Sequence, residues 1–335
     1  MTRQTVKSFM RKLQLLLLFI LCVAKLSAQQ EKHIVKHLKI TILSTMLAQP
    51  GFGEWGFSAL VEADSNKILY DAGGHENSVL ENAKELNIDL SNVPTLVLSH
   101  WHDDHALGWL PLRNAMSTIN QQAFSATHVG TGFFYSRIVP KGSGFIKAKN
   151  DRSNRGTDSL LYIKTGGKIV EHNHFDEIFP GVYLTGPVPR QYPEKNYPAG
   201  VQIRDASGNL IDDNVPEDMS LVISTDQGMV LLTGCGHAGI INTLTYSRNN
   251  LQQQPLLAAL GGFHLMQSTD EQIKWTAEQL KTSGIRYFMG AHCTGIEPVY
   301  QIREWAGLKR GECIVGSVGA TFDLDKGFTA GALTR

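Results

Sequence analysis

The chain has 335 residues, of which 42% are hydrophobic, so it can bury one large core or two ordinary ones. This composition excludes a chain that is disordered throughout. The 31 basic residues balance the 31 acidic ones, but they are unevenly spread, so the balance does not exclude a charged partner.

The first element in chain order has the pattern of an export signal. Residues 1–12 carry basic residues and no acidic one, the run from Leu13 to Val23 is apolar, and Ala24–Ala28 ends in small residues. These are the three parts of a secretory signal peptide, and the apolar run is shorter than the ~20 residues of a membrane-spanning helix. We expect residues 1–28 to be removed on export to the periplasm or the medium. A retained N-terminal membrane anchor is the alternative.

Removal of the signal changes the charge of the protein. It takes away five basic residues and no acidic one, so the mature chain of 307 residues has 26 basic and 31 acidic residues, a net charge of −5. A mildly acidic protein is not drawn to nucleic acid by bulk electrostatics. We expect a small-molecule substrate, no nucleic-acid partner and no stable membrane span, while the oligomeric state stays open. The three remaining cysteines are too few for a disulfide scaffold.

Strands and helices are predicted to alternate along the first half of the mature chain. Residues 117–220 give a weaker pattern, and the segment 186–214 reads as one long loop, a length typical of lids and binding segments. The predicted strands are 38–45, 57–62, 67–71, 95–99, 159–164, 168–170 and 182–185. The predicted helices are 77–86 and 106–116, the second broken or kinked at Pro111.

The second half repeats this organisation. A hairpin opens each half and no linker-like stretch divides them, which indicates sheets covered by helices. We therefore expect a single domain, residues 29–335, built of two similar layers. The predicted strands here are 220–224, 229–233, 256–263, 286–290 and 312–318, and the predicted helices are 240–249, 269–283 and 301–306.

A dense group of metal-ligand side chains directly follows the strand predicted at 95–99. It reads Ser99-His100-Trp101-His102-Asp103-Asp104-His105. His100 and His102 are two residues apart on an extended segment, so both can face one ion, and Asp104 and His105 on the following turn can face a second. Nitrogen and oxygen donors of this kind suit Zn²⁺ or another borderline divalent ion. The alternative is a histidine-rich surface turn, which the position between a buried strand and a helix disfavours.

The motif resembles the H-x-H-x-D-H signature of the metallo-β-lactamase superfamily of metallo-hydrolases. Further resemblance, in segments 55–60, 68–73, 233–243, 261–265 and 291–295, extends over most of the mature chain. These segments are similar to a branch labelled 7,8-dihydropterin-6-methyl-4-(β-D-ribofuranosyl)-aminobenzene-5'-phosphate synthase-like. The resemblance implies an αββα sandwich of the α/β (α+β) class, with two mixed β-sheets flanked by helices and a metal site at one edge.

The resemblance also implies which residues hold metal. His100 and His102 would bind one ion and Asp104 and His105 the other, and His292 fits the last histidine ligand of the second ion. The resemblance favours two zinc ions, with iron or manganese and a mononuclear site as alternatives.

The middle of the pattern departs from the better-known members of the superfamily. They have a separate histidine before the bridging carboxylate, but residues 181–187 contain none. We therefore expect His237 to supply that ligand. Cys235 stands at the bridging position and bridges the ions, binds one of them, or packs beneath them.

Other residues are candidates for roles around the ions. His264 ends a strand at the same edge and is either an extra ligand or a catalytic substrate contact. Asp71 is placed to orient a ligand histidine from outside the coordination sphere. His128 and Arg137 flank a glycine-rich turn and are candidate contacts for an anionic substrate, with a folded loop of no such role as the alternative.

A divalent ion lowers the pKa of bound water from ~15.7 to ~7, which supplies hydroxide at neutral pH. We expect a hydrolase in which Asp104 orients a metal-bound hydroxide toward a small ester, lactone, amide or phosphoester. An iron-dependent oxidoreductase and a non-catalytic metal-stabilised binding protein are the alternatives, and a tRNA-processing nuclease fits the charge and the export signal less well. Because pterin-pathway intermediates are cytoplasmic, export also argues against the synthase activity of the branch label.

Overall fold

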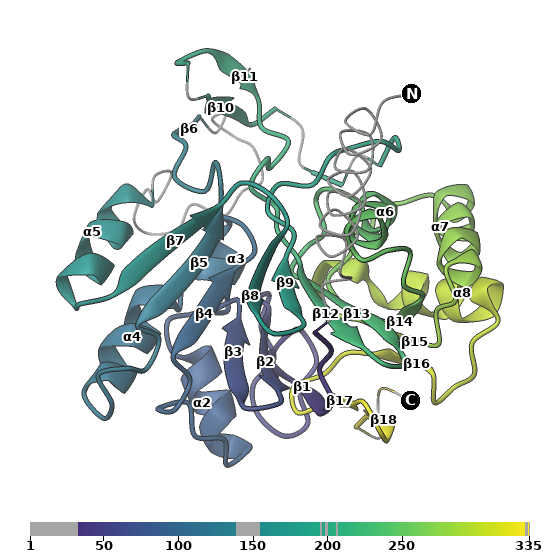
Figure 1. The fold of residues 1–335 in the computed structure, drawn as a ribbon, viewed down its shortest axis with the longest axis horizontal. Helices are drawn as coiled ribbons and strands as arrows, with labels where there is room; N and C mark the ends of the chain where they lie inside the picture. The colour runs from purple at the N-terminus through teal and green to yellow at the C-terminus, as the bar shows by residue number, and fades with distance from the viewer. Residues whose placement is uncertain are drawn as a thin grey trace, which may run out of the picture. The chain divides into compact units, whose positions relative to one another are not determined.

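The computed structural model describes residues 33–138, 155–331 and 334, apart from positions 195, 198, 199 and 206. The predicted export signal, residues 1–28, lies outside the described residues. Contacts group Ile34–Arg335 into one unit. Its described strands form two large sheets and a small one (Figure 1). Within the described part of the chain, no helix is both long and apolar enough to cross a membrane.

The first large sheet has eight strands in the order β18-β17-β1-β2-β3-β4-β5-β7. Strands β17 to β3 pair antiparallel with their neighbours, whereas β3, β4, β5 and β7 pair in parallel, so the sheet is mixed. Its strands are β1 (Leu38–Ser44), β2 (Ser58–Ala63), β3 (Asn66–Tyr70), β4 (Thr95–Leu98), β5 (Ala126–Gly130), β7 (Lys168–His172), β17 (Thr321–Asp323) and β18 (Gly327–Thr329).

The second large sheet has seven strands in the order β16-β15-β14-β13-β12-β9-β8. Strands β13 to β16 run parallel, so their carboxyl ends lie at one edge, and the remaining strands are antiparallel. Its strands are β8 (Asp176–Phe179), β9 (Val182–Leu184), β12 (Leu221–Thr225), β13 (Gly228–Thr233), β14 (Leu256–Gly261), β15 (Tyr287–Gly290) and β16 (Cys313–Val315).

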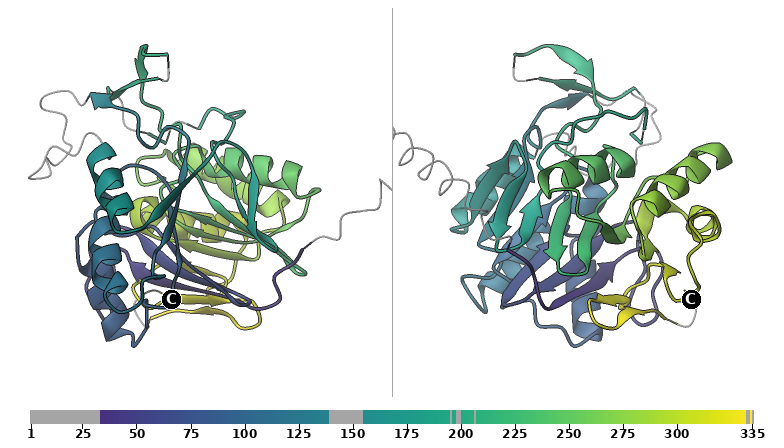
Figure 2. Two further views of the ribbon diagram at one scale, coloured as in Figure 1. Left: turned by 60° about the vertical axis from the view of Figure 1, so that its left-hand side comes forward. Right: turned by 45° about the vertical axis from the view of Figure 1, so that its right-hand side comes forward.

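Helices cover the outer faces of both sheets (Figures 1 and 2). Because strand side chains alternate between faces, each sheet contributes one apolar face to a central core and the other to a helix-covered core. The result is an αββα sandwich with two mixed sheets, which confirms the predicted fold class. The first sheet is covered by α2 (Ser78–Glu85), α4 (Trp109–Ser117) and α5 (Gly156–Lys164), and the second by α6 (Ile240–Asn250), α7 (Asp270–Thr282) and α8 (Ile296–Ala306).

The strand predicted at residues 159–164 is wrong, because these residues lie in helix α5. The apolar run Leu160-Leu161-Tyr162-Ile163 resembles a buried strand, yet only Tyr162 is buried, between Trp109 and the end of the first sheet. Leu160 and Ile163 are exposed.

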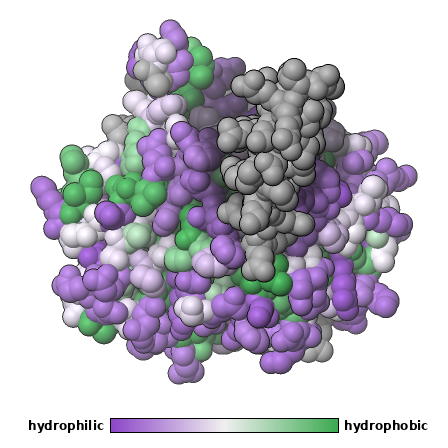
Figure 3. Space-filling model, viewed as in Figure 1, coloured by the Kyte–Doolittle hydropathy of each residue, from purple (hydrophilic) through white to green (hydrophobic). Residues whose placement is uncertain are grey.

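On the face drawn in Figure 3, hydrophilic side chains predominate and hydrophobic ones form small separate groups.

Two other predictions need smaller corrections. The helix expected at 106–116 is two helices, α3 (Asp103–Ala106) and α4, separated by Leu107 and Gly108. Pro111 lies in the first turn of α4, where a missing N–H removes no helical hydrogen bond. The loop expected at 186–214 contains β10 (Gln202–Arg204) and β11 (Leu210–Asp212), which form the small sheet with β6 (Arg137–Ile138). Helix α8 begins earlier than predicted.

Candidate metal centre

The ligand-type side chains gather where strands end at one edge of the sandwich. His100 and His102 follow β4, and α3 then carries Asp104 and His105. Cys235 and His237 follow β13, His264 follows β14, and His292 begins the short helix η1 (His292–Thr294) after β15. Because carboxyl ends of parallel strands share an edge, residues far apart in the sequence come together there. The carriers of the site are thus the segments that follow β4, β13, β14 and β15.

Three histidines form the first group of possible ligands. The Nε2 atom of His100 lies 2.9 Å from the Nδ1 atom of His102. The ring of His237 completes the group, with its centre 4.7 Å from that of His100 and 4.9 Å from that of His102. One nitrogen from each residue lies within 4.8 Å of the others, so a single ion can contact all three.

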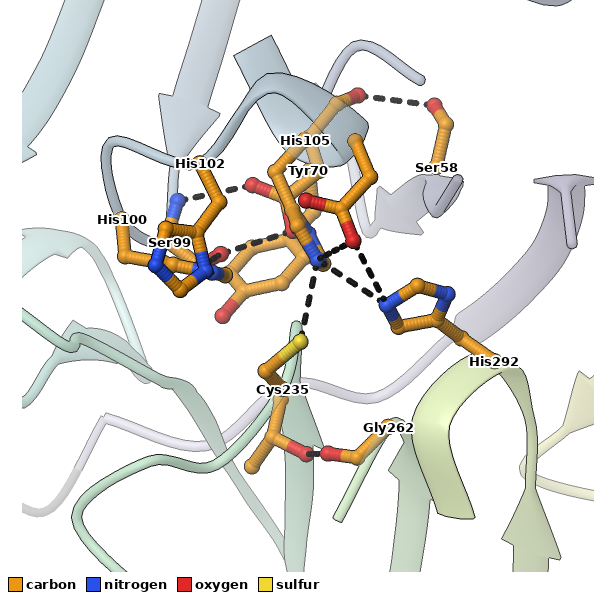
Figure 4. A network of polar contacts seen from close by, with 12 residues as sticks. Ser58, Tyr70, Ser99, His100, His102, His105, Cys235, Gly262 and His292 are labelled. Atoms are coloured by element: carbon orange, nitrogen blue, oxygen red, sulfur yellow. Dashed lines mark hydrogen bonds and ion pairs between the residues drawn. The ribbon is translucent and has the colours of Figure 1, made fainter. Parts of the chain in front are cut away.

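Asp104, His105, Cys235 and His292 form the second group. Figure 4 shows His105, Cys235 and His292 pointing toward one another. The Nε2 atom of His105 lies 3.1 Å from the sulfur of Cys235 and 3.3 Å from Nε2 of His292. A carboxylate oxygen of Asp104 lies 3.3 Å from that same His292 nitrogen. These two groups contain every residue that the sequence nominated as a ligand except His264.

Cys235 and His237 join the two groups, because both also form a third group with His264. The ring centres of His237 and His264 lie 4.9 Å apart. Nε2 of His237, Nδ1 of His264 and Nδ1 of His292 are buried and have no hydrogen-bond partner among the described residues. Buried polar atoms are normally paired. The unpaired Nε2 of His237, a member of two of these groups, therefore fits a site for divalent metal ions, whereas His292 faces Asp104 and His105 with Nε2 and not with its unpaired Nδ1.

Asp71 orients the motif from beneath. One of its carboxylate oxygens accepts the Ser99 N–H at 2.7 Å, and the other lies 2.8 Å from the Ser99 hydroxyl and 2.7 Å from Nδ1 of His105. The Ser99 hydroxyl in turn lies 2.9 Å from Nδ1 of His100. A carboxylate at Nδ1 leaves Nε2 of His105 free to bind a cation. Asp71 thus lies where it can orient the ring of His105 without itself binding an ion.

Close packing beneath the site needs a glycine at position 234. A Cβ atom there would lie 2.2 Å from the Ser99 hydroxyl oxygen and 2.5 Å from a carboxylate oxygen of Asp71. Any side chain at Gly234 would thus push the carboxylate away from His105. Gly234 lies between the end of β13 and Cys235, so one short stretch both supplies a ligand and makes room for the supporting carboxylate.

The protonation states of the histidines suit cation binding. Burial lowers the pKa of His102 to about 3 and that of His100 and His237 well below the ordinary value, so their lone pairs are free. Although burial opposes the charged form of His105, the carboxylates of Asp104 and Asp71 raise its pKa to about 9. The same negative charge that favours a proton on His105 would favour a cation in its place.

His128 and Arg137, the candidate contacts for an anionic substrate, have other partners. Arg137 is buried, and its guanidinium lies 2.7 Å from Glu217 and 3.3 Å from Asp213 and donates to three backbone carbonyls. Its donors are thus spent inside the protein rather than offered to an anion. Nδ1 of His128 lies 2.8 Å from Nε2 of His172. Burial lowers the pKa of His128 to about 4, so it carries no charge at neutral pH.

A cavity of about 310 Å³ lies beside the loop that carries His237. Asp218 and Arg190 line it, and Asp218 accepts the N–H of Ala238, the residue after His237, at 2.8 Å. Arg190 donates to the carbonyl of His237 at 2.5 Å. Burial raises the pKa of Asp218 to about 6. The other lining residues are Pro187, Val188, Asn214, Val215, Pro216 and Ala238.

Sequence reasoning missed the residues that support the ligands from elsewhere in the chain. The Asn196 carbonyl contacts Nδ1 of His237, and the Thr45 hydroxyl accepts the backbone N–H of His292. The exposed ring of Trp55 lies 4.7 Å from that of His292, measured between centres. None of these residues belongs to a local motif, so only their position in the fold reveals them. Ser99 stood inside the recognised segment and was the one with a sequence signal.

Comparison with known proteins finds similarity to one superfamily. Residues 56–117, which include the motif, match the model of the metallo-β-lactamase superfamily. Over 273 residues the chain is 28% identical to the Methanocaldococcus jannaschii 7,8-dihydropterin-6-methyl-4-(beta-D-ribofuranosyl)-aminobenzene-5'-phosphate synthase, covering 78% of this chain and 90% of the relative.

Solved structures share the fold over most of the chain. Tm1679, a metal-dependent hydrolase of the beta-lactamase superfamily, is 26% identical with a TM-score of 0.66, covering 85% of this chain and 98% of its own. Zn²⁺-bound PqqB from Methylobacterium extorquens is 14% identical with a TM-score of 0.50, covering 85% and 100%. The chain thus shares the motif, the family-model match over residues 56–117 and the fold with proteins of the metallo-β-lactamase superfamily.

Proposed function

We propose that this protein is a divalent-metal-dependent hydrolase that holds two zinc ions. The observation that carries the proposal is the convergence of two ligand groups, one of three histidines and one that contains Asp104 and Cys235, together with the unpaired buried Nε2 of His237 in the first group. Neutral imidazoles, a thiol and a carboxylate form the donor set that zinc prefers. The similarity to Tm1679, a metal-dependent hydrolase, supports the same chemistry.

The residues of the chain have separate roles in this proposal. A pair of bound ions would lower the pKa of a water molecule and polarise the bond to be cleaved. Asp104 contacts His292 and approaches His105, which places its carboxylate at the second group to hold an ion and orient the attacking water. His264 keeps an unpaired Nδ1 near both groups and is suited to hydrogen-bond the substrate.

The substrate in this proposal is a small ester, lactone, amide or phosphoester. The cavity beside His237 is at the small end of the ~300–1,000 Å³ range of ligand pockets, which favours a compact molecule. Its walls combine Arg190 and Asp218 with prolines and valines, so they can contact polar and apolar parts of one substrate.

The test joins metal analysis to a substrate panel. The purified protein should contain about two equivalents of zinc and hydrolyse at least one of p-nitrophenyl acetate, γ-butyrolactone, a p-nitroanilide or p-nitrophenyl phosphate. His102→Ala and Asp104→Ala should lose metal and activity together, whereas His75→Ala, which removes an exposed histidine, should keep both. Unchanged metal content in both site variants would overturn the proposal, and purified iron with redox turnover would favour an oxidoreductase.

We also propose that the hydrolase works outside the cytoplasm. The basic start, the apolar run and the small residues of positions 1–28 support export. Expression of the full chain should place the protein in the periplasmic or culture fraction with a new N-terminus near Gln29. Recovery of uncleaved chain in the cytoplasm would contradict export, and recovery in the membrane fraction would indicate a retained anchor.

A second candidate function comes from the similarity to the Methanocaldococcus jannaschii synthase, which extends over 90% of that relative. The same metal centre would then serve a dihydropterin-related synthesis. Incubation of the metal-loaded protein with that enzyme's substrates separates the two candidates, because synthase turnover without hydrolysis of the panel would favour this function.

A further inference from the structure

Trp101, the residue between the first two histidines of the motif, is held on three sides by side chains from distant segments. Its backbone N–H donates to Glu217 at 3.2 Å, and its backbone carbonyl accepts from two nitrogens of Arg155 at 3.1 and 3.0 Å. The guanidinium of Arg137 lies over its ring, 4.7 Å from the ring centre. Backbone donor, backbone acceptor and aromatic face of one residue are therefore all fixed.

The three side chains around Trp101 are themselves buried and linked. Arg137, Arg155 and Glu217 are 4%, 1% and 0% exposed, which is rare for charged residues unless they are paired. Glu217 uses its second carboxylate oxygen to bind Arg137 at 2.7 Å. Arg155 also pairs with Asp103 and, at 3.1 Å, with Asp158. We call Arg137, Arg155 and Glu217, with Trp101 between them, the Trp101 clamp.

The first ligand group needs such support. His100 and His102 have ring nitrogens 2.9 Å apart, and His237 lies against both rings. One N–H can lie between His100 and His102, but the lone pair that His237 adds then has no donor until a cation binds. The peptide groups on either side of Trp101 set where His100 and His102 point, so fixing Trp101 fixes this convergence.

We propose that the Trp101 clamp is a positioning device that pre-organises the three-histidine site and raises its affinity for metal. The inference rests on the metal centre of the proposed function and adds residues that touch neither metal nor substrate. Ligand side chains that are already held in place bind an ion more tightly, because they lose less conformational entropy on binding. Asp71 contacts His105 of the second group directly but reaches His100 of the first group only through Ser99, so loss of the clamp should weaken the two groups unequally.

Arg155 is the residue to replace, and Arg113 provides a matched control. Arg113 is equally buried, 1% exposed, and donates to the carbonyls of Gln121, Ala123 and Thr165 at 2.6–2.8 Å, but it does not contact the motif. Both Arg155→Met and Arg113→Met remove a buried guanidinium: that of Arg113 binds three backbone carbonyls, and that of Arg155 binds the Trp101 carbonyl and the carboxylates of Asp103 and Asp158. Both should therefore lower the melting temperature of the metal-free protein by a similar amount.

Metal binding distinguishes a positioning role from a merely structural one. In chelator competition, Arg155→Met should weaken the first-site zinc affinity at least tenfold and reduce the stoichiometry toward one, while Arg113→Met keeps the wild-type values. With Co²⁺, the thiolate charge-transfer absorption of the Cys235 group should persist in Arg155→Met as the signal of the three-histidine site weakens. Arg155→Lys keeps the charge beside Asp103 and should recover part of the affinity.

The outcomes separate the clamp from the proposed function. Equal zinc affinities at both sites in Arg155→Met and the wild type would overturn the clamp and leave the metal centre intact. Equal losses in Arg155→Met and Arg113→Met would also overturn it, since they would show a general effect of stability. If Arg155→Met does not fold, Arg155→Lys decides, because it loses the double contact to the Trp101 carbonyl. A wild-type protein that binds no zinc would overturn the proposed function and the clamp with it.

Discussion

Asp71 shows how much one carboxylate can determine at the residue scale. It contacts Ser99 twice and His105 once, and its backbone adopts a left-handed conformation, with φ of 60°. Such a conformation is uncommon for residues other than glycine and costs energy. The strain is offset by three buried polar contacts, and it places the carboxylate under the ring of His105.

Replacing Asp71 by asparagine should weaken metal binding. The amide can still accept the Ser99 N–H, but its NH₂ group would face Nδ1 of His105. That nitrogen must then accept a hydrogen bond, which moves the proton to Nε2 and blocks it as a ligand. We expect zinc affinity at the second group to fall roughly 10–100-fold. Equilibrium dialysis against wild type and Asp64→Asn, an exposed control, checks this; undiminished affinity would contradict the orienting role.

A second prediction at the residue scale concerns pH and Glu194. This side chain accepts the N–H groups of Asn242 and Ile241 at 2.8 and 3.2 Å at the start of α6. Burial nevertheless raises its pKa to about 7. A carboxyl with a raised folded-state pKa binds more protons when folded, so it makes the protein less stable as pH rises from about 4.5 to about 7.

Glu194→Gln should therefore flatten part of this pH dependence. The difference in unfolding free energy between variant and wild type should shift by about 1–3 kcal/mol in favour of the variant between pH 4.5 and pH 7.5. Urea titrations at a series of pH values measure it. Glu85→Gln, at an exposed position on α2, should leave the dependence unchanged. A constant difference for Glu194→Gln across the range would refute the raised pKa.

Residue types near one another in sequence were the predictable part of the site. The motif at 100–105, together with Cys235 and the histidines that follow strands, gave all the ligand-type side chains that converge. Arg155 and Glu217 were not predictable, because they lie 54 and 116 residues from Trp101 and carry no local pattern. Arg137 was noticed, but only the fold shows that its charge is paired inside the protein.

At the scale of elements, helix α7 has the clearest start signal. Thr269 accepts the N–H of Gln272, and the Gln272 side chain accepts the N–H of Thr269, which is a reciprocal capping box. Thr269→Ala should lower the free energy of unfolding by about 1 kcal/mol. Because α7 lies on the outer face of the second sheet, metal content should not change. Denaturant unfolding with Ser268→Ala as control tests this, and a loss of metal would show unexpected coupling.

Elements with one regular apolar face were predicted well, and α5 was not. In α7 the buried residues Ile273, Ala277 and Leu280 recur at helical spacing. In α5 the apolar residues are consecutive, and Leu160 and Ile163 face away from the core. The spacing of apolar residues predicts secondary structure only when those residues are the buried ones. An exposed apolar run such as that in α5 therefore gives a wrong prediction. The hairpin β10–β11 was not predicted for a related reason: β11 is exposed throughout, so its sequence shows no alternation of apolar and polar residues that would indicate a strand.

At the scale of the whole molecule, the two ligand groups draw on both large sheets. Strand β4 of the first sheet and β13 to β15 of the second deliver them to one edge. Ions at that edge would stabilise the folded state alone, because the ligands are scattered in the unfolded chain. When the free zinc concentration is 1,000 times the dissociation constant, binding adds about 4 kcal/mol to the free energy of unfolding.

Removal of metal should therefore lower the melting temperature, by on the order of 10 °C for a chain of this size. Differential scanning calorimetry before and after treatment with a chelator, followed by zinc addition, measures the loss and its recovery. His102→Ala, which has a disrupted first group, should show a smaller difference. A chelator-treated protein with an unchanged transition would indicate that no stabilising ion was bound.

The architecture as a whole was predictable from the order of hairpins and of strand–helix alternation, together with the resemblance carried by the motif. The pairing order of strands was not, since β17 and β18 join the first sheet from the far end of the chain. Apolar strands that are buried on both faces carry no mark of their neighbours, so only the complete packing of the sheets selects the partners.

The contact between His105 and His292 joins residues 187 positions apart. Because contacts between residues so far apart in sequence are costly to close, we predict that this one forms late in folding, after the sheets. Ions bound there would be absent from the folding transition state. They would therefore leave the rate of folding almost unchanged and slow the rate of unfolding. In the exported zinc enzyme that we propose, the bound ions would therefore lengthen the lifetime of the folded molecule.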